Sequence, residues 1–336
     1  MTVYSPALSP VGVLGTGSCL PEHVVSNAAV AELAGVTPSW IERKTGIRER
    51  RYAADHQASS DLAGTAARRA LDVAGLHPEQ VRWIIVATST PDHPQPATAT
   101  LVQDRLGASR AAAFDVNAVC AGFVAALQVA TRLLAGAEKD CYALVIGAEV
   151  YSRIIDRQDR RTAPLFGDGA GAIVLGSVSD GRGVLGTGIR TDGHLHELIG
   201  VPAGGSRLPV SEKTVELGQH YFQMQGRNVR DYVMSHLPSA VSGLLEHFGV
   251  GPERVDHFVP HQANGAMLKD VWKLLGLSRA QAHLPVEFHG NTGAASIPLA
   301  LDHACSAHRL ADDELVVLAG FGGGMTVTTA LLTWGC

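Results

Sequence analysis

The sequence predicts an α/β fold made of two related halves. Apolar, β-branched runs typical of buried strands alternate with longer helical patterns, which indicates mostly parallel sheets covered by helices. Segments 75–88 and 249–262, which lie about half the chain apart, share one pattern. In each, a helix ends at Gly, Pro-Glu and Val follow, and a strand begins. With 336 residues, 46% of them hydrophobic, the chain can fill the core that such a fold needs.

The first half is expected to begin with a strand at 12–17 and a helix at 27–35. A long alanine-rich helix then runs from Ser59 to about Gly75, and a strand follows at 83–88. The glycines of the first strand match neither GxGxxG nor a P-loop pattern, so they indicate a turn rather than a phosphate cradle.

Basic residues concentrate between positions 39 and 51, in SWIERKTGIRERR, beside Glu42 and Glu49. Such a run is usually a solvated surface of mixed charge. A basic rim that receives phosphates is the alternative.

Three further pairs of segments extend the repeat: 114–123 with 284–305, 142–152 with 314–324, and 167–178 with 322–334. We therefore expect two halves, residues 1–178 and 179–336, packed about a pseudo-twofold axis. Residues 181–225 are rich in Gly, Pro and polar side chains and are expected to form loops or an antiparallel extension.

The composition excludes several classes of protein. A net charge of -5 without long basic tracts argues against nucleic acid as a partner. Five scattered cysteines without CxxC indicate neither a disulfide framework nor a zinc site, and fit a reducing compartment. The apolar segments are too short for a bilayer, and the N-terminus lacks a signal-peptide pattern. We expect a cytoplasmic protein that associates with no membrane and binds no metal.

Cys120 lies at the bend between an apolar strand and a helix in FDVNAVCAGF. Unpaired N–H groups and the macrodipole at a helix N-terminus favour thiolate, the nucleophilic form. The alternative is a buried cysteine that acts as a small hydrophobe, the interpretation expected for Cys19, Cys141 and Cys305.

Two other segments are expected to converge on Cys120. Ligands of open α/β sheets bind beyond the carboxyl ends of strands, where the loops of both halves can meet. His261 follows a strand in VPHQAN, and Asn291 precedes a helix in HGNTGAAS. Alone, His261 indicates a structural histidine and Asn291 a cap or turn. Beside Cys120 they complete the set that a catalytic cysteine needs.

Over essentially its whole length the chain resembles β-ketoacyl-acyl-carrier-protein synthase III, a thiolase-fold condensing enzyme. The motifs are DVNAVCAGF, FGDGAGA (166–172), HQAN (261–264) with GNTGAAS (290–296), and GFGGG (320–324). SWIERKTGIRER resembles the family's N-terminal signature. Elongating ketosynthases have a second His at Asn291, and chalcone synthases have Pro in the glycine loop where this chain has Gly323. The resemblance implies a five-layered αβαβα thiolase-like fold, a homodimer, and no cofactor.

The resemblance also implies a mechanism. Cys120 would take the acyl group from an acyl-CoA, and the N–H groups of Cys120 and Gly323 would form an oxyanion hole. His261 and Asn291 would bind the thioester carbonyl of a malonyl extender, carried by acyl carrier protein or CoA. Decarboxylation and attack on the acyl group would give a β-ketoacyl thioester, as a starter step of fatty-acid or polyketide-type biosynthesis.

Four more residues take roles from the resemblance. Trp40 would stack on the CoA adenine, with Arg160 flanking it. Phe166 would line the site behind the cysteine. The loop at 91–100 would enter the acyl pocket of the partner subunit and bring Gln95 there.

The chain departs from the family at three positions. Gln95 replaces an apolar residue, which suggests a primer that is longer than acetyl or polar. Ala266 and Asp231 stand where the family has Arg and Lys, and losing positive charge weakens docking of an acidic carrier protein. Other basic groups, Lys269, Lys273 and the cluster at 43–51, are expected to compensate.

These departures support an alternative function. The same Cys-His pair can pass the acyl group from Cys120 to a hydroxyl or amine, with His261 as general base. A non-catalytic partner subunit is disfavoured, because the cysteine, the histidine and Asn291 are all present.

Overall fold

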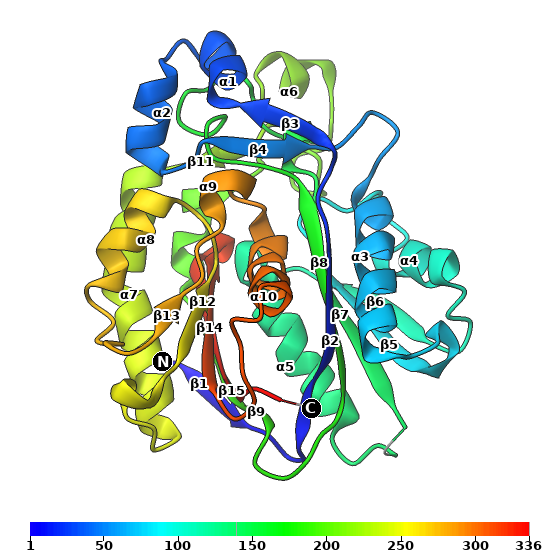
Figure 1. Cartoon of the computed structure of the whole chain (residues 1–336). Coiled ribbons are helices and arrows are strands. Elements are labelled where there is room, and N and C mark those ends of the chain that lie inside the picture. Colours follow the sequence, from blue (N-terminus) through cyan, green and yellow to red (C-terminus); the bar gives the residue numbers. More distant parts are fainter. Residues whose placement is uncertain (139, 336) are drawn as a thin grey trace.

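In the computed structural model, which describes residues 1–138 and 140–335, the chain folds into two main sheets with helices around and between them (Figure 1). In spatial order the first sheet contains β2 (Val11–Cys19), β8 (Gly169–Ser177), β7 (Tyr142–Glu149), β5 (Val81–Ala87) and β6 (Ala112–Val116). The second contains β1 (Val3–Pro6), β9 (Gly183–Thr191), β15 (Thr326–Thr333), β14 (Leu315–Gly322), β12 (His257–Pro260) and β13 (Gln281–Ala282).

The two sheets repeat one topology, which confirms the predicted duplication. In the first, β5 pairs in parallel with β6 and β7, and β8 is antiparallel to β7 and β2. In the second, β12 pairs in parallel with β13 and β14, and β15 is antiparallel to β14 and β9. Matching 3₁₀ turns, Pro78–Gln80 and Pro252–Arg254, lead into β5 and towards β12.

The helices complete five layers in the predicted αβαβα order (Figure 1). Helices α5 (Gly122–Leu134) and α10 (Ser296–Ser306) lie between the sheets, in one apolar core with both. Helices α3 (Ser59–Ala74) and α4 (Thr98–Leu106) cover the outer face of the first sheet. Helices α7 (Gly226–His247) and α8 (Gly265–Trp272) cover the second. Among the described residues, no helix combines the length and apolarity needed to cross a bilayer.

Smaller elements gather at one end of the layers, at the top of Figure 1. They are α1 (Asn27–Ala34), α2 (Pro38–Thr45), α6 (Glu212–Glu216), α9 (Val286–His289), the β3–β4 pair (His23–Ser26 with Glu49–Tyr52) and the β10–β11 pair (Ile199–Gly200 with Gln223–Met224). The N-terminal end of α2 is fixed by Thr37, whose side chain accepts the Trp40 N–H at 3.1 Å. Trp40 is thereby set on the first turn of this helix.

Residues 181–225 contain an antiparallel extension, which is one of the two expected outcomes. Strand β9 pairs antiparallel with β15 and with β1 in the second sheet. A Cβ on Gly186 of this strand would collide with the ring of Phe248. The glycine therefore lets an aromatic ring pack against the strand. Beyond β9, the antiparallel β10–β11 pair agrees with the expected extension.

The basic run at 39–51 does not form a continuous basic rim. Arg50 is fully buried, and its guanidinium donates to Asn27 Oδ1 at 2.8 Å and to the Pro164 carbonyl at 2.7 Å. Arg48 is held by two glutamates. Lys44 stays exposed on α2. Arg50 therefore tethers the β3–β4 region to the main body of the protein.

Replacing Arg50→Ala is expected to lower the free energy of unfolding by about 3 kcal/mol, because it opens a cavity and leaves buried acceptors without a donor. Arg43→Ala removes an exposed guanidinium of the same run and should change the free energy of unfolding by less than about 0.5 kcal/mol. Urea unfolding followed by circular dichroism measures both. Equal losses would contradict the structural role of Arg50.

Candidate active site

Cys120 lies on a strained turn between β6 and α5. It belongs to the 3₁₀ turn Val119–Ala121, just before the helix begins at Gly122. Val119 has φ 48°, a left-handed conformation that β-branched residues rarely adopt. Asn117 Oδ1 accepts the Val119 N–H at 3.1 Å and supports the turn. This is the predicted strand, bend and helix, with backbone strain next to the thiol.

The glycine loop after β14 lies directly against this turn. A Cβ on Gly322 would stand 2.7 Å from the Cys120 nitrogen, and one on Gly323 3.1 Å from Val119 Cγ2. Glycine is therefore required for the main chain of the second half to approach the cysteine of the first. The structure brings together the two segments that the sequence assigned to the oxyanion hole.

The thiol is more deeply buried than the sequence suggested. Burial raises the pKa of Cys120 to about 12, and the negative charge of Glu149 adds to this rise. The side-chain hydrogen bond between Tyr151 Oη and Cys120 Sγ, which lie 4.0 Å apart, acts in the opposite direction. Burial thus opposes the stabilisation of thiolate that is expected from the helix terminus. Cys120 needs a proton acceptor when it reacts.

His261 follows β12 and is almost completely buried. Its Nδ1 lies 2.7 Å from Ser296 Oγ, whose own proton is donated to the Gly293 carbonyl at 2.9 Å. This network assigns the imidazole proton to Nδ1 and leaves Nε2 as an acceptor. Burial lowers the pKa of His261 to about 3, so the ring is neutral.

Main-chain hydrogen bonds hold Asn291 in place. Its N–H donates to the Leu165 carbonyl at 2.8 Å, and its carbonyl accepts from the Gly167 N–H at 3.0 Å. This bridge fastens it beside Phe166. Its Oδ1 accepts the Gly293 N–H at 2.9 Å, so the amide is oriented and Nδ2 is left to donate.

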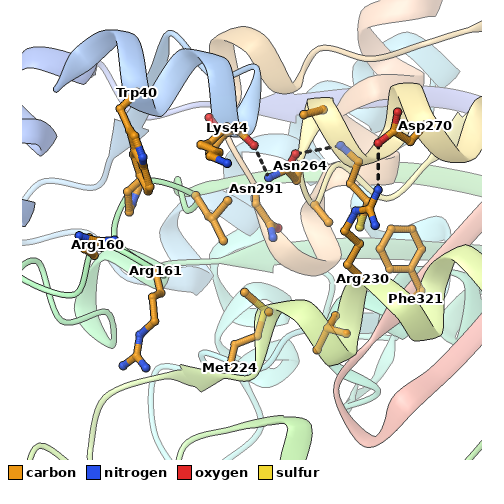
Figure 2. Close-up of a pocket in the computed structure, with 18 residues that line it drawn as sticks. Trp40, Lys44, Arg160, Arg161, Met224, Arg230, Asn264, Asp270, Asn291 and Phe321 are labelled. Carbon is orange, nitrogen blue, oxygen red and sulfur yellow. Dashed lines mark hydrogen bonds and ion pairs between the residues drawn. The ribbon is translucent and has the colours of Figure 1, made fainter. Parts of the chain in front are cut away.

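A pocket of about 480 Å³ leads from the surface to Asn291 and Phe321 (Figure 2). The ring of Phe321 stands edge-on to His261, with 5.0 Å between the centroids. At the mouth the Arg160 guanidinium carbon lies 5.9 Å from the centre of the Trp40 ring. The structure thus brings the predicted CoA-binding pair together at the entrance. Among the described residues, no cluster of His, Cys, Asp or Glu side chains is arranged to hold a metal ion.

Charges at this mouth are partly neutralised. Asp270 binds Arg230 at 3.0 Å, as Figure 2 shows, and Asp159 binds Arg161 at 2.9 Å. No ion pair of the described residues includes Lys44 or Arg160, which also line the pocket. Two basic side chains therefore face the entrance without a bound carboxylate.

The remaining predicted residues are divided between the interior and the surface. Phe166 is buried and stacks on Tyr151, with 4.4 Å between the ring centroids. Gln95 is exposed and does not line the pocket of its own chain, so its entry into a partner's site stays a prediction. Ala266 lines the pocket mouth and Asp231 is exposed on α7.

Sequence reasoning missed Glu149, Tyr151 and Ser296. The first two follow the same strand-end rule as His261, because Glu149 ends the apolar strand YALVIGAE and Tyr151 begins the turn that follows it. An acidic residue closing so apolar a run was the available signal. Ser296 had none, because its role depends on how α10 meets β12.

Comparison with known proteins decides the family. The family model described as 3-oxoacyl-[acyl-carrier-protein (ACP)] synthase III matches residues 114–193, and the model of its C-terminal part matches 245–334. The chain belongs to this family. The name is a synonym of β-ketoacyl-acyl-carrier-protein synthase III, so the resemblance seen in the motifs is confirmed, and the chain is a condensing enzyme of this type.

Relatives cover almost the entire chain. Acetoacetyl CoA synthase NphT7 from a Streptomyces strain is 54% identical over 96% of this chain and 98% of its own. The β-ketoacyl-[acyl-carrier-protein] synthase III of Symbiobacterium thermophilum is 44% identical over 98% and 99%.

Solved structures of synthase III enzymes confirm the thiolase-like fold. That of the Thermus thermophilus enzyme has a TM-score of 0.89 at 39% identity and covers 96% of this chain and 99% of its own. A priming β-ketosynthase from a polyketide biosynthetic pathway has a TM-score of 0.89 at 31% identity, covering 98% and 97%.

The glycine loop gives a test of the site. Gly322→Ala would push a methyl group against the Cys120 amide, and we expect acylation of Cys120 to fall about 100-fold. Stopped incubations with acyl-CoA followed by intact-protein mass spectrometry measure the rate.

The matched control is Gly205→Ala, at a position where a Cβ meets nothing within 4 Å. Its rate should equal that of the unmodified protein. An unchanged rate in Gly322→Ala would show that the loop contact plays no part in acyl transfer.

Proposed function

We propose that this synthase III enzyme joins a short acyl group from acyl-CoA, foremost acetyl, to malonyl-CoA and releases a β-ketoacyl-CoA. The observation that carries this choice of extender is the charge of the pocket mouth. Arg230 is bound by Asp270, and Ala266 and Asp231 supply no positive charge, which weakens the attraction of this surface for an acidic carrier protein. Lys44 and Arg160 remain available for the phosphates of CoA.

A relative supports the same assignment. The name of NphT7, acetoacetyl CoA synthase, denotes a product that stays on CoA, and it shares 54% of its residues with this chain. The other relatives named above are synthases or priming enzymes. A starter role in fatty-acid or polyketide-type biosynthesis therefore remains part of the proposal.

The first half-reaction acylates Cys120. Its sulfur attacks the thioester carbonyl, the thiol gives up its proton, and the CoA thiolate leaves and takes a proton from water at the pocket. The developing oxyanion would lie against the main chain where Gly323 and Cys120 meet. Trp40 and Arg160 would hold the nucleotide end of CoA at the entrance, where the two side chains stack.

The second half-reaction forms the new bond. Asn291 Nδ2 donates to the malonyl thioester carbonyl and stabilises the enolate formed as carbon dioxide leaves. His261 can donate from Nε2 only when its proton moves from Nδ1, which requires the Ser296 hydroxyl to turn from Gly293 towards the ring. The carbanion then attacks the acyl group and expels Cys120.

The surroundings of the thiol favour a small primer. Tyr151 and Phe166 stack, Phe222 meets both rings edge-on, and the Tyr151 hydroxyl stands 4.0 Å from Cys120 Sγ. This aromatic wall leaves more room for an acetyl than for a long chain. The longer or polar primer that Gln95 suggests stays a prediction, because that residue would act in the site of the partner subunit.

The deciding experiment is intact-protein mass spectrometry after incubation with a panel of acyl-CoAs, followed by a malonyl chase. We expect an acetyl adduct that Cys120→Ser abolishes. Malonyl-CoA should discharge it about tenfold faster than malonyl-carrier protein, because docking charges are missing. In the double variant Ala266→Arg/Asp231→Lys, malonyl-carrier protein should discharge the adduct faster, while the rate of discharge by malonyl-CoA should stay the same.

Two other outcomes would revise the proposal. Faster discharge by malonyl-carrier protein in the unmodified enzyme would identify that donor, which is usual in the family, as the extender. An adduct that resists both malonyl donors but leaves to a hydroxyl or amine acceptor would make the protein an acyltransferase.

Asn291→Ala separates the two half-reactions. Removal of the Nδ2 donor should cut malonyl decarboxylation about 100-fold, while self-acylation falls by less than about threefold. Release of labelled carbon dioxide and the burst of acyl-enzyme give the two rates. Equal losses would remove Asn291 from the decarboxylation step.

A further inference from the structure

A buried carboxylate lies behind the nucleophile. Glu149 ends β7 and is fully buried. Its oxygens accept from the Ser89 N–H at 3.1 and 3.2 Å, the Ser89 hydroxyl at 2.9 Å and the Thr90 hydroxyl at 2.6 Å. The Ala294 N–H lies at 3.5 Å. None of the half-reactions described above uses this group.

The hydrogen bonds run in one direction. An ionised carboxylate only accepts hydrogen bonds, so the Ser89 hydroxyl donates its single proton to Glu149. Tyr151 Oη lies 3.0 Å from Ser89 Oγ and must therefore donate to it. The lone pairs of Tyr151 Oη are then left to accept from the thiol of Cys120 at 4.0 Å. A continuous path of donors leads from Cys120 to Glu149.

We propose that Tyr151 and Ser89 relay the thiol proton of Cys120 to Glu149, which stores it until the nucleophile is regenerated. This inference rests on the proposed function only in that acyl transfer is the reaction served. Tyr151 contacts the reacting sulfur directly, whereas Glu149 and Ser89 act through it.

The proton balance closes over one turnover. When Cys120 attacks, its proton passes to Tyr151, that of Tyr151 to Ser89, and that of Ser89 to Glu149; the C–S bond to CoA breaks and the CoA thiolate is protonated by water. When the carbanion attacks acyl-Cys120, the S–C bond breaks, and the same path returns the proton from Glu149 to the sulfur. The net reaction consumes one solvent proton and releases free CoA and carbon dioxide.

The electrostatics of the two candidate acceptors differ. Burial raises the pKa of Glu149 to about 7, where a group can both take and return a proton. Burial lowers the pKa of His261 to about 3, which makes it a poor store. Burial also holds the pKa of Tyr151 well above its usual value, so the link remains a hydroxyl.

The titratable groups that face Glu149 are Cys120 and Tyr151, from the turn before α5 and the turn after β7. Its other partners, from the segment after β5 and the turn before α10, are neutral hydroxyl and N–H groups. Hydroxyl bonds to the charged form hold its pKa down against burial.

The test measures the rate at which iodoacetamide alkylates Cys120 across pH, with peptide mass spectrometry to separate it from the other cysteines, and in parallel the acetyl-CoA burst. In the unmodified protein both rates should rise with a midpoint near pH 7, about where Glu149 ionises. Tyr151→Phe keeps the ring but removes the link. It should slow both reactions about tenfold at neutral pH and abolish that midpoint.

Ser89→Ala and Thr90→Val form a matched pair. Each deletes one hydroxyl that donates to Glu149, but only Ser89 lies on the path to the thiol. Ser89→Ala should behave like Tyr151→Phe. Thr90→Val should keep the sigmoidal profile with its midpoint moved to higher pH, because loss of a donor to the charged form raises the carboxyl pKa.

Unchanged pH profiles in both Tyr151→Phe and Ser89→Ala would overturn the relay, as would equal effects of Ser89→Ala and Thr90→Val. If Tyr151→Phe does not fold, as circular dichroism would show, the Ser89 and Thr90 pair decides alone. A relay-dependent alkylation profile without any acyl adduct would sustain the relay and reject the proposed acyl-CoA substrate.

Discussion

Close main-chain contact between the two halves is the constraint on which the site depends. Three glycines allow it. A Cβ on Gly322 would meet the Cys120 nitrogen at 2.7 Å, one on Gly171 the Leu299 nitrogen at 2.6 Å, and one on Gly147 would collide with the Ala294 carbonyl. Because the two sheets share α5 and α10 as a common middle layer, these contacts hold both helix starts against the strands of the opposite half. Cys120 and Ser296 both occupy such starts.

Much of this arrangement followed from pattern and repetition. The repeat predicted the equivalence of β5 with β12, and one rule for strand ends identified Cys120, His261 and Asn291 together. Local pattern left the structure open, or predicted it wrongly, where a tertiary partner decides the outcome. The glycines of β9 make room for Phe248, which lies far along the chain. Arg50 looked like a surface charge, but its acceptors come from other elements.

The ionisation of the site was the least predictable feature, since it depends on burial. The local signal at Cys120 was a helix start, which favours thiolate, whereas the fold removes the water that a thiolate needs. Burial also keeps His261 neutral, and it raises the pKa of Glu149 to about 7. All three shifts favour the uncharged form, because all three side chains are buried.

A buried site suits the proposed decarboxylation. A malonyl carboxylate concentrates negative charge on two oxygens, and the enolate that replaces it spreads the charge towards a carbonyl oxygen held by fixed donors. Low local polarity strengthens those donors, and a neutral His261 offers no cation that would stabilise the carboxylate in its ground state. A proton store such as Glu149 then belongs behind the thiol rather than beside the extender. There its charge raises the pKa of Cys120. In the proposed relay, its protonation during acylation would remove that charge before the proposed anionic extender binds.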